Sequence, residues 1–264
     1  MTAGGVLAVF AHPDDESLLA GGTLAACARA GLDVGLISLT RGELGEIADA
    51  ALATQDDLPA IRAGELEAAG RVLGASWTEC LDFPDGSLEW AGGDAVREAV
   101  AERIAEHAPR AVITFAREGL YWHPDHLTTH RLTVDAVASA SDDLWLYGAT
   151  WPIGLAERVV SELQASGLAA GLWGLEPAAF GAEEEAITTV LDVSAHLSTK
   201  LAALRAHRTQ LGSDHLLSTM PRDLAAKLLG CEYFVRLRSP AASQDWLPEA
   251  TNLPTSETLG GLLG

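Results

Sequence analysis

Residues 6–16 read Val-Leu-Ala-Val-Phe-Ala-His-Pro-Asp-Asp-Glu, so a short apolar run is followed at once by a histidine and three carboxylates. An apolar run of this length with polar residues after it indicates a strand that is buried on both faces. In an open α/β sheet, side chains at the carboxyl ends of the strands face the ligand crevice. The segment from His12 to Glu16 is therefore expected to lie at a binding site.

Outward from this run, strand patterns alternate with helix patterns, which is typical of a mainly parallel sheet flanked by helices. The predicted strands of the first half span residues 6–11, 34–40, 79–83 and 111–116, and the predicted helices span residues 18–30, 61–73, 94–106 and 125–139. After Leu144 the pattern is less regular, with strands expected at residues 187–193 and 232–237 and a helix at 194–211. We predict an α/β fold in which residues 1–264 form a single domain.

The composition argues against two classes of partner. The chain has 17 basic and 37 acidic residues, a formal net charge of -20, which disfavours the phosphate contacts that nucleic-acid binding requires. No apolar stretch approaches the ~20 residues needed to span a membrane. The three cysteines have no paired spacing, which favours a reduced, cytoplasmic protein over a disulfide framework; they are Cys27, Cys80 and Cys231.

A second polar group, His123-Pro124-Asp125-His126, follows the strand predicted at residues 111–116. Both groups are therefore expected at the same edge of the sheet, although they are far apart in the sequence. Neighbouring carboxylates repel one another unless a cation or buried hydrogen bonds compensate them, so a metal ion accounts for both groups. Two neutral histidines and a carboxylate suit zinc with one position open to water.

Each motif also has a purely structural reading. A His-Pro pair in a loop is often a turn, and Asp-Asp-Glu before a helix can cap that helix and complement its dipole. The two motifs together favour a functional site, because each follows a predicted strand.

Four segments together resemble the LmbE-like N-deacetylase family, also called PIG-L, which includes deacetylases of mycothiol and bacillithiol synthesis. They are His12 to Glu16, the loop Thr40 to Glu46, the helix at residues 62–73, and His123 to His126. Later residues are also similar to the family, namely Lys200, His207, Gln210 and the run Glu232-Tyr233-Phe234. The resemblance implies a Rossmann-like fold and the metal-dependent removal of an acyl group from an N-acetylglucosaminyl conjugate.

The same resemblance implies a role for each motif residue. The ligands that it implies for zinc, or alternatively iron(II), are His12, Asp15 and His126. Asp14 would act as general base, and His123 would be a catalytic histidine oriented by Asp125. These roles agree with the needs of amide hydrolysis, which are an activated water, a stabilised oxyanion and a proton donor.

Other residues match family positions outside the motifs. Tyr121 corresponds to a tyrosine that can approach the oxyanion. Three residues are implied to bind substrate, although each could equally form a surface ion pair; they are Glu46, Arg62 and Asp85. We expect His130 to have a packing or supporting role and not to bind the metal, and we expect structural roles for Lys200 and His207.

Two features bear on substrate selection. Many relatives have a glycine directly before His123, where this chain has Trp122, which can narrow the pocket or offer an apolar platform. The long connection at residues 40–59 contains glycines and is expected to lie over the pocket and to help select the substrate.

Several functions stay open from the sequence. Within the same mechanism, the chain could be an amidase that cleaves larger mycothiol-type conjugates. Two histidines and one carboxylate also form the facial triad of iron(II) oxygenases, but Asp14 has no evident task in such an enzyme. A third alternative is a non-catalytic binding module on the same scaffold. The expected partner is a small N-acyl sugar conjugate, and the oligomeric state is left open, including a homo-oligomer.

Overall fold

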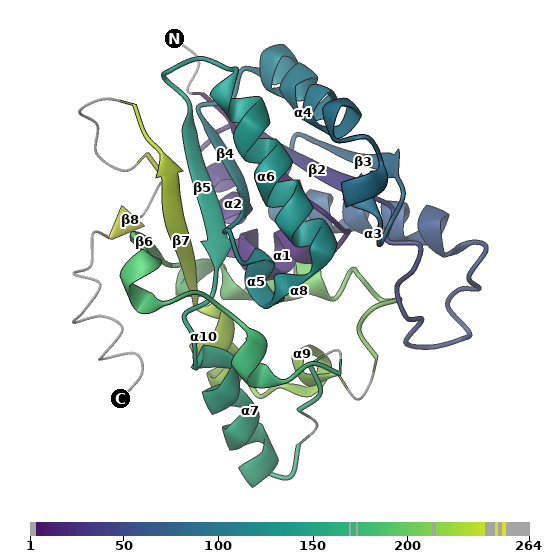
Figure 1. Ribbon diagram of the computed structural model, residues 1–264. Coiled ribbons are helices and arrows are strands. Elements are labelled where there is room, and N and C mark those ends of the chain that lie inside the picture. Colours follow the sequence, from purple (N-terminus) through teal and green to yellow (C-terminus); the bar gives the residue numbers. More distant parts are fainter. Residues whose placement is uncertain are drawn as a thin grey trace.

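The computed structural model describes residues 4–168, 170–172, 174–212, 215–240, 246–247 and 250–251. One sheet of eight strands runs through this part of the chain (Figure 1). In chain order the strands are β1 Val6–Phe10, β2 Val34–Thr40, β3 Trp77–Phe83, β4 Ala111–Phe115, β5 Trp145–Thr150, β6 Thr189–Asp192, β7 Cys231–Arg238 and β8 Ala250–Thr251.

The order of the strands across the sheet is β3-β2-β1-β4-β5-β7-β6-β8. Strands β1 to β5 pair in parallel, and β7, β6 and β8 continue the sheet with antiparallel pairs. The parallel part has the strand order of the Rossmann fold, 3-2-1-4-5. The expected α/β, Rossmann-like, mainly parallel sheet is therefore confirmed.

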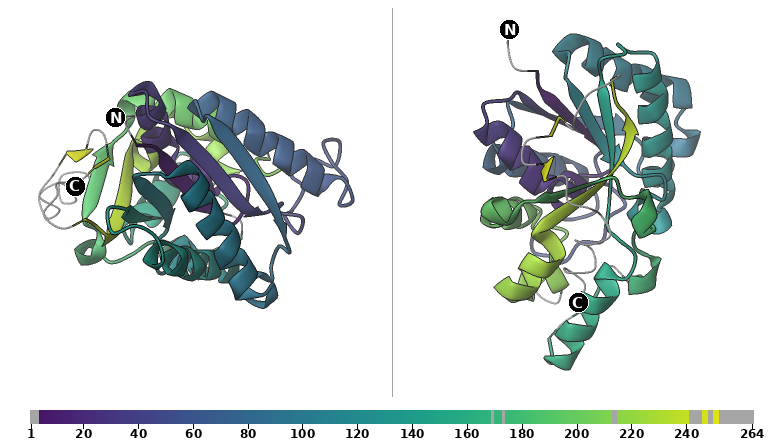
Figure 2. Two further views of the ribbon diagram at one scale, coloured as in Figure 1. Left: turned by 90° about the horizontal axis from the view of Figure 1, so that it is seen from above. Right: turned by 90° about the vertical axis from the view of Figure 1, so that its left-hand side faces the viewer.

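Helices cover both faces of the sheet (Figure 2). They are α1 Asp15–Leu19, α2 Gly21–Arg29, α3 Leu58–Leu73, α4 Gly93–His107, α5 Gly119–Trp122, α6 Pro124–Ala138, α7 Leu155–Ala165, α8 Leu197–Leu204, α9 Leu216–Thr219 and α10 Arg222–Leu229, with short 3-10 helices at Leu88–Trp90, Pro177–Ala179, Glu184–Ala186 and Ser194–His196. Helices α2, α3 and α8 pack together, and so do α4 and α6. None of the described helices is long and apolar enough to cross a membrane.

The core of the sheet is a rigid platform for the residues at its carboxyl edge. Every residue of β1, β2 and β4 is buried, as expected for parallel strands that helices cover on both faces. The rings of Phe10 and Phe115 meet edge to face with centroids 4.9 Å apart, which joins the ends of β1 and β4. Burial of apolar surface contributes roughly 25 cal/mol per Å², so these strand ends are held firmly.

Strands β1 and β4 are neighbours in the sheet, but the chain adds β2 and β3 on one side of β1 and then adds β4 and β5 on the other side. Such a switch point leaves a crevice outside the carboxyl ends of the strands, where ligands bind in open α/β sheets. His12 follows β1 and the segment at residues 116–126 follows β4, so both sequence motifs border this crevice.

Several elements differ from the sequence prediction. The helix expected at residues 18–30 is two helices, α1 and α2. The acidic motif itself begins α1, and Ala20 has a non-helical backbone conformation that separates the two helices. The helix expected at residues 194–211 ends at Leu204, so His207 and Gln210 lie in the turns that follow α8. Strand β5 and helix α7 were not predicted: β5 is a short run that contains Trp145 and Gly148, whereas α7 does show a helical spacing of apolar residues that the sequence prediction missed.

Candidate active site

The two motifs meet in the crevice between β1 and β4. Asp15 is the first residue of α1, and His126 lies in the first turn of α6. Helix α6 begins at Pro124, whose fixed φ suits a first helical position, and the His123 side chain caps it. Since α6 packs against β1, His126 is brought to His12 across more than a hundred residues of sequence.

The ligand atoms of three side chains point toward one another. Nδ1 of His12 and Nε2 of His126 are 3.2 Å apart. Oδ1 of Asp15 lies 3.5 Å from Nε2 of His126, and Oδ2 lies 3.5 Å from Nδ1 of His12. A tetrahedral zinc ion with bonds of ~2.0–2.1 Å places neighbouring ligand atoms about 3.3 Å apart. The two histidine nitrogens therefore have the spacing of two corners of a tetrahedron, and each Asp15 oxygen lies at a similar distance from one of them, so the three side chains fit a divalent metal.

Both imidazole rings are held so that one nitrogen is left for a metal. Nε2 of His12 lies 3.0 Å from Oδ1 of Asp85 and 3.4 Å from Oδ2 of Asp125, so the ring proton is directed to this side. Nδ1 of His126 donates to the carbonyl oxygen of Gly119 at 2.9 Å. Bonds of this kind fix the tautomer and the orientation of a ligating histidine.

The charges around the three side chains favour a bound cation. Burial lowers the pKa of His126 to about 3, so this ring is neutral and able to bind a metal. Burial acts to raise the pKa of Asp15, but the neighbouring histidines outweigh it and hold the pKa at about 2. Burial also acts to lower the pKa of His12, yet hydrogen bonds with Asp125, Asp15 and Asp85 raise it well above the usual value. The carboxylates around His12 thus favour a positive charge at this ring, and a bound metal ion would supply one.

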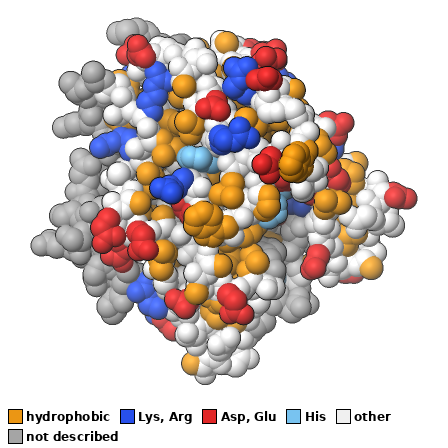
Figure 3. Space-filling model, in the orientation of Figure 1, with side chains coloured by type: hydrophobic (Ala, Val, Ile, Leu, Met, Phe, Trp, Pro, Cys, Tyr) orange, Lys and Arg blue, Asp and Glu red, His pale blue; other side chains and the backbone are white. Residues whose placement is uncertain are grey.

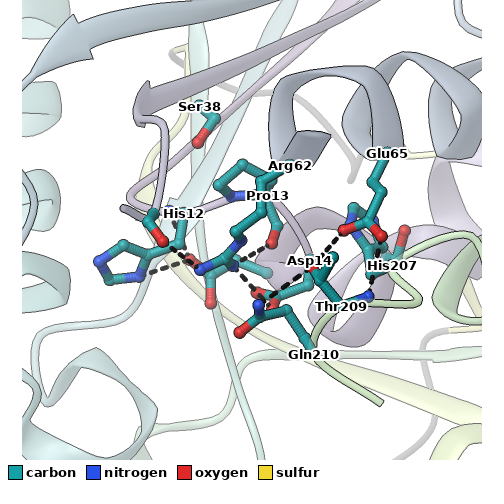
Figure 4. A network of polar contacts seen from close by, with 12 residues as sticks. His12, Pro13, Asp14, Ser38, Arg62, Glu65, His207, Thr209 and Gln210 are labelled. Carbon is teal, nitrogen blue, oxygen red and sulfur yellow. Dashed lines mark hydrogen bonds and ion pairs between the residues drawn. The ribbon is translucent and has the colours of Figure 1, made fainter. Parts of the chain in front are cut away.

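Asp14 lies beside these residues in an unusual conformation. Its φ is 128°, a value that L residues rarely adopt, and at the N-cap position of α1 it makes no capping hydrogen bond. Its Oδ2 instead lies 3.1 Å from Nη2 of Arg62, as Figure 4 shows. Burial raises the pKa of Asp14 to about 6, with Arg62 opposing the rise. Asp14 therefore does not cap α1 with its side chain, and its carboxylate faces Arg62 instead.

The contacts of Asp125 correct one expectation. Its carboxylate accepts hydrogen bonds from the backbone N–H groups of Gly86 at 2.7 Å and Leu88 at 3.1 Å, and it faces His12. The contact with His123 comes from the backbone N–H of Asp125, which donates to Nδ1 at 3.2 Å. The carboxylate thus orients His12 and not His123, because the start of α6 turns it toward the loop after β3.

His123 and Tyr121 face the same space from the other side. Since Nδ1 of His123 accepts a backbone hydrogen bond, the neutral ring carries its proton on Nε2, and burial lowers the pKa of this histidine. His123 also has a ligand atom within 4.8 Å of those of His12 and His126, while Asp15 places one oxygen 3.5 Å from each of these two rings. The Tyr121 ring centroid is 5.1 Å from that of His126, and burial raises the pKa of Tyr121, which keeps its hydroxyl protonated.

Strained backbone brings this segment to the site. Gly119, Leu120 and Trp122 have φ values of 58°, 65° and 65°, and positive φ in non-glycine residues costs ~1–3 kcal/mol each. A Cβ on Gly119 would lie 2.7 Å from Cβ of His126, so only glycine allows its carbonyl to reach that ring. The Trp122 side chain is 60% exposed and does not line the pocket, so it does not narrow the pocket.

A pocket of about 280 Å³ is lined by two of the three proposed ligand side chains, His12 and Asp15. Polar residues lie on its inner side, and leucines form much of the remaining wall; these are Leu18, Leu44, Leu204, Leu211 and Leu217. Hydrophobic side chains also gather across the middle of the face in Figure 3, with many acidic side chains toward its margin. The sequence did not indicate the leucines, because a leucine carries no chemical signal until the fold places it.

The three residues expected to bind substrate lie in different surroundings. Glu46 is exposed and outside the pocket lining, whereas Leu44 of the same loop lines the pocket. Arg62 lines it too, but its guanidinium also donates to the carbonyl oxygens of Pro13 at 2.6 Å and Gly42 at 2.8 Å. Asp85 gives one oxygen to His12 and accepts a hydrogen bond from the Leu44 backbone with the other. Polar atoms of Arg62 and of Asp85 are therefore already engaged in contacts within the protein.

His130, His207 and Lys200 make contacts away from the proposed ligand atoms. Nδ1 of His130 lies 2.8 Å from the Phe115 carbonyl oxygen, which ties α6 to β4. Nζ of Lys200 lies 2.6 Å from Oε1 of Glu232, and both side chains are buried. Figure 4 shows His207 on the far side of Asp14 from Arg62.

Comparison with known proteins identifies the family. Residues 7–137 match the family model described as "PIG-L: GlcNAc-PI de-N-acetylase". The chain is 34% identical to the 1D-myo-inositol 2-acetamido-2-deoxy-alpha-D-glucopyranoside deacetylase of Acidothermus cellulolyticus, and the match covers 89% of each chain. The chain belongs to the PIG-L family. Its motifs His12 to Glu16 and His123 to His126 both lie inside the matched segment.

Solved structures show how widely this PIG-L fold is used. The conserved protein TT1542 from Thermus thermophilus superposes with a TM-score of 0.60 at 26% identity and covers 92% of this chain and 99% of its own. The 4-carboxy-2-hydroxymuconate hydratase GalB from Pseudomonas putida superposes with a TM-score of 0.63 at 21% identity, over 92% of this chain and 99% of GalB. The second likeness concerns the fold alone, so the function of a PIG-L protein has to be argued from its site.

Proposed function

We propose that this protein is a zinc-dependent N-deacetylase that removes the acetyl group from an N-acetylglucosaminyl conjugate. The observation that carries the proposal is the set of His12, Asp15 and His126, with nitrogen and oxygen atoms 3.2–3.5 Å apart, next to the Asp14 carboxylate in the same pocket. The 34% identity to a deacetylase of an N-acetylglucosaminyl inositol supports the same reaction.

The metal would be held by the two histidines and the carboxylate of this set. Neutral imidazole nitrogens with one carboxylate are a usual donor set of catalytic zinc, and iron(II) is the other ion that they suit. A divalent ion held there supplies Lewis acidity, which makes a water more acidic and an acyl carbonyl more electrophilic. The acidic neighbours Asp85 and Asp125 hold His12 in the orientation that this binding needs.

Asp14 is the proposed general base. It lines the pocket, and the Arg62 guanidinium fixes its carboxylate in place. With a pKa of about 6 it is mostly ionised at neutral pH and can take a proton from the attacking water, yet it is basic enough for the transfer to be efficient. The same carboxyl group can then return the proton to the departing amine.

His123 and Tyr121 are the proposed hydrogen-bond donors to the acyl oxygen as negative charge develops on it. The neutral His123 ring presents its proton on Nε2 toward the pocket, because Nδ1 is bound to the α6 backbone. Tyr121 lines the same pocket and keeps its phenol proton. Donors fixed in a buried site stabilise an oxyanion more than water does, because they need no reorganisation.

The residues that line the pocket indicate what kind of substrate it can accept. The amide of the sugar has to reach the proposed metal ligands. The leucines of the pocket wall, among them Leu44, Leu204 and Leu217, lie where the rest of the conjugate can pack. Gln210 offers an amide group to sugar hydroxyls from the same wall. We therefore expect recognition of the N-acetylglucosamine unit by polar groups and additional binding from apolar contact with the attached group.

An amine-release assay with the purified protein tests the proposal. The panel would contain N-acetylglucosamine and its methyl, octyl and inositol glycosides, with free amine and acetate measured together. We expect equimolar release of both products, abolished by a chelator and restored by zinc. No release from any member with a fully zinc-loaded protein would refute the deacetylase proposal, and restoration by iron(II) alone would refute the choice of zinc.

A further inference from the structure

The backbone conformation of Asp14 has to be held from outside the motif. A φ of 128° with a side chain present is strained, and such residues persist only where the surroundings fix them. The ordinary alternative is open to Asp14, since an aspartate at an N-cap normally turns its carboxylate onto the first amides of the helix. In this protein the carboxylate turns away from α1 and faces Arg62 and the pocket.

The neighbouring carboxylate of Glu16 holds the Asp14 backbone. The backbone N–H of Asp14 donates to Oε2 of Glu16 at 3.0 Å. This side chain is only 2% exposed, although it belongs to the first turn of α1, where most glutamates face solvent. Its other oxygen, Oε1, accepts hydrogen bonds from the Ser17 hydroxyl and from Nε2 of His207, the latter at 2.9 Å.

The contact with His207 comes from the opposite end of the chain. His207 lies in the turns after α8, 191 residues from Glu16, and is fully buried. Its other ring nitrogen, Nδ1, has no hydrogen-bond partner among the described residues. Among the described residues the ring therefore makes one side-chain hydrogen bond, and its acceptor is the carboxylate that also binds the Asp14 backbone.

We propose that His207 is a positioning residue for catalysis, which fixes Glu16 so that Glu16 holds Asp14 in its strained conformation with the carboxylate turned to the pocket. The proposal rests on the function proposed above, in which Asp14 is the general base. It assigns His207 a task beyond packing. Misplacement of a reacting group by about 1 Å can lower a rate ~100-fold, so this support affects turnover more than substrate affinity.

The competing explanation is that His207 only stabilises the fold. The chain contains a matched control, because Lys200 of the adjacent helix α8 makes a second buried ion pair, with Glu232. That pair holds the first amides of α2, since Glu232 accepts hydrogen bonds from the backbone of Gly22 and Thr23, and it does not contact Asp14. Loss of Lys200 should lower stability without moving the proposed base.

The experiment compares His207→Leu, His207→Gln and Lys200→Met with the unchanged protein, all loaded with zinc. We expect His207→Leu to lower kcat roughly 10- to 100-fold, with KM and the zinc dissociation constant within about threefold. His207→Gln, whose amide can donate to Glu16, should regain most of kcat. Lys200→Met should lower Tm at least as much as His207→Leu and leave kcat within about threefold.

Either of two results would overturn the proposal: a His207→Leu protein that keeps its kcat, or a Lys200→Met protein that loses kcat equally. If His207→Leu does not fold, His207→Asn replaces it, because the shorter amide cannot make the same contact. Crystal structures of the protein without substitutions and of the variant give a measurement that does not depend on activity. The φ angle of Asp14 should be positive in the first structure and should return to a negative value in the second. If φ of Asp14 is the same in the variant, the positioning role is contradicted. If the protein without substitutions is inactive on every N-acetylglucosaminide, only the deacetylase proposal is contradicted.

Discussion

Nε2 of His12 lies 3.0 Å from Oδ1 of Asp85, so a residue expected to bind substrate instead holds one of the proposed metal ligands. Burial acts to raise the pKa of Asp85, but the hydrogen bond with His12 and its charge outweigh burial and lower it. An ionised partner of this kind keeps the ring proton on Nε2 and leaves Nδ1 to the metal.

The first prediction follows from that contact. Asp85→Ala should weaken zinc binding by roughly 10- to 100-fold, because partners that orient a ligating histidine contribute that much to metal affinity. Competition with a chromophoric chelator measures the dissociation constant, and exposed Glu46→Ala serves as the control. A normal zinc affinity with a raised KM would return Asp85 to the role of substrate contact.

The second prediction concerns the ligand set. His126→Ala removes one of the three proposed protein ligands, so zinc content after dialysis should fall sharply. His130→Ala should keep its zinc, because that ring is bound to the Phe115 carbonyl oxygen and not to the cluster. Elemental analysis of both variants is the measurement. Stoichiometric zinc in the first variant and loss in the second would exchange the two assignments.

The third prediction separates metal binding from proton transfer. Asp14→Asn keeps the shape of the side chain and its contact with Arg62, but the amide cannot act as a base. Zinc content should be unchanged, and kcat should fall roughly 100-fold or more, the usual loss when general-base catalysis is removed. Steady-state kinetics on fully loaded protein gives the answer, and a turnover close to that of the unchanged enzyme would exclude Asp14 as the base.

The fourth prediction concerns the loop between β2 and α3. Leu44 lines the pocket and is nevertheless 68% exposed, so it is available to contact the attached group of a substrate. Leu44→Ala should lower kcat/KM for the octyl glycoside severalfold more than for N-acetylglucosamine, since removal of apolar contact costs about 1–3 kcal/mol. Glu46→Ala, outside the pocket lining, should change both substrates little. Equal losses on both substrates in Leu44→Ala would mean that the loop only stabilises the site.

Part of this architecture could be predicted from the sequence, because it depends on local patterns. Strand β2 was predicted with its observed bounds, since a buried parallel strand is a continuous apolar run between polar residues. The meeting of His12 with His126 followed from the position of each motif after a parallel strand. These inferences needed only the general rule that the carboxyl ends of such strands share one edge.

Other features depend on tertiary contacts that leave no periodic signal in the sequence. The pairing of His12 with Asp85 and the contact of Glu16 with His207 join residues from distant segments. The direction of the Asp125 carboxylate depends on how α6 begins against the loop after β3. Because Asp125 is close to His123 in the sequence, we expected its carboxylate to contact His123. In the structure the first turn of α6 directs this carboxylate toward Gly86, Leu88 and His12 instead.

The late position of His207 in the chain has a consequence for biosynthesis. A ribosome finishes both motifs with the proposed metal ligands, and the whole segment that matches the family model, well before it makes Leu204, His207 and Glu232. Until that last third emerges and packs, the nascent chain lacks part of the pocket wall and the partner of Glu16. On the role proposed for His207, a chain that stops short of this residue carries every proposed metal ligand but lacks the support proposed for Asp14.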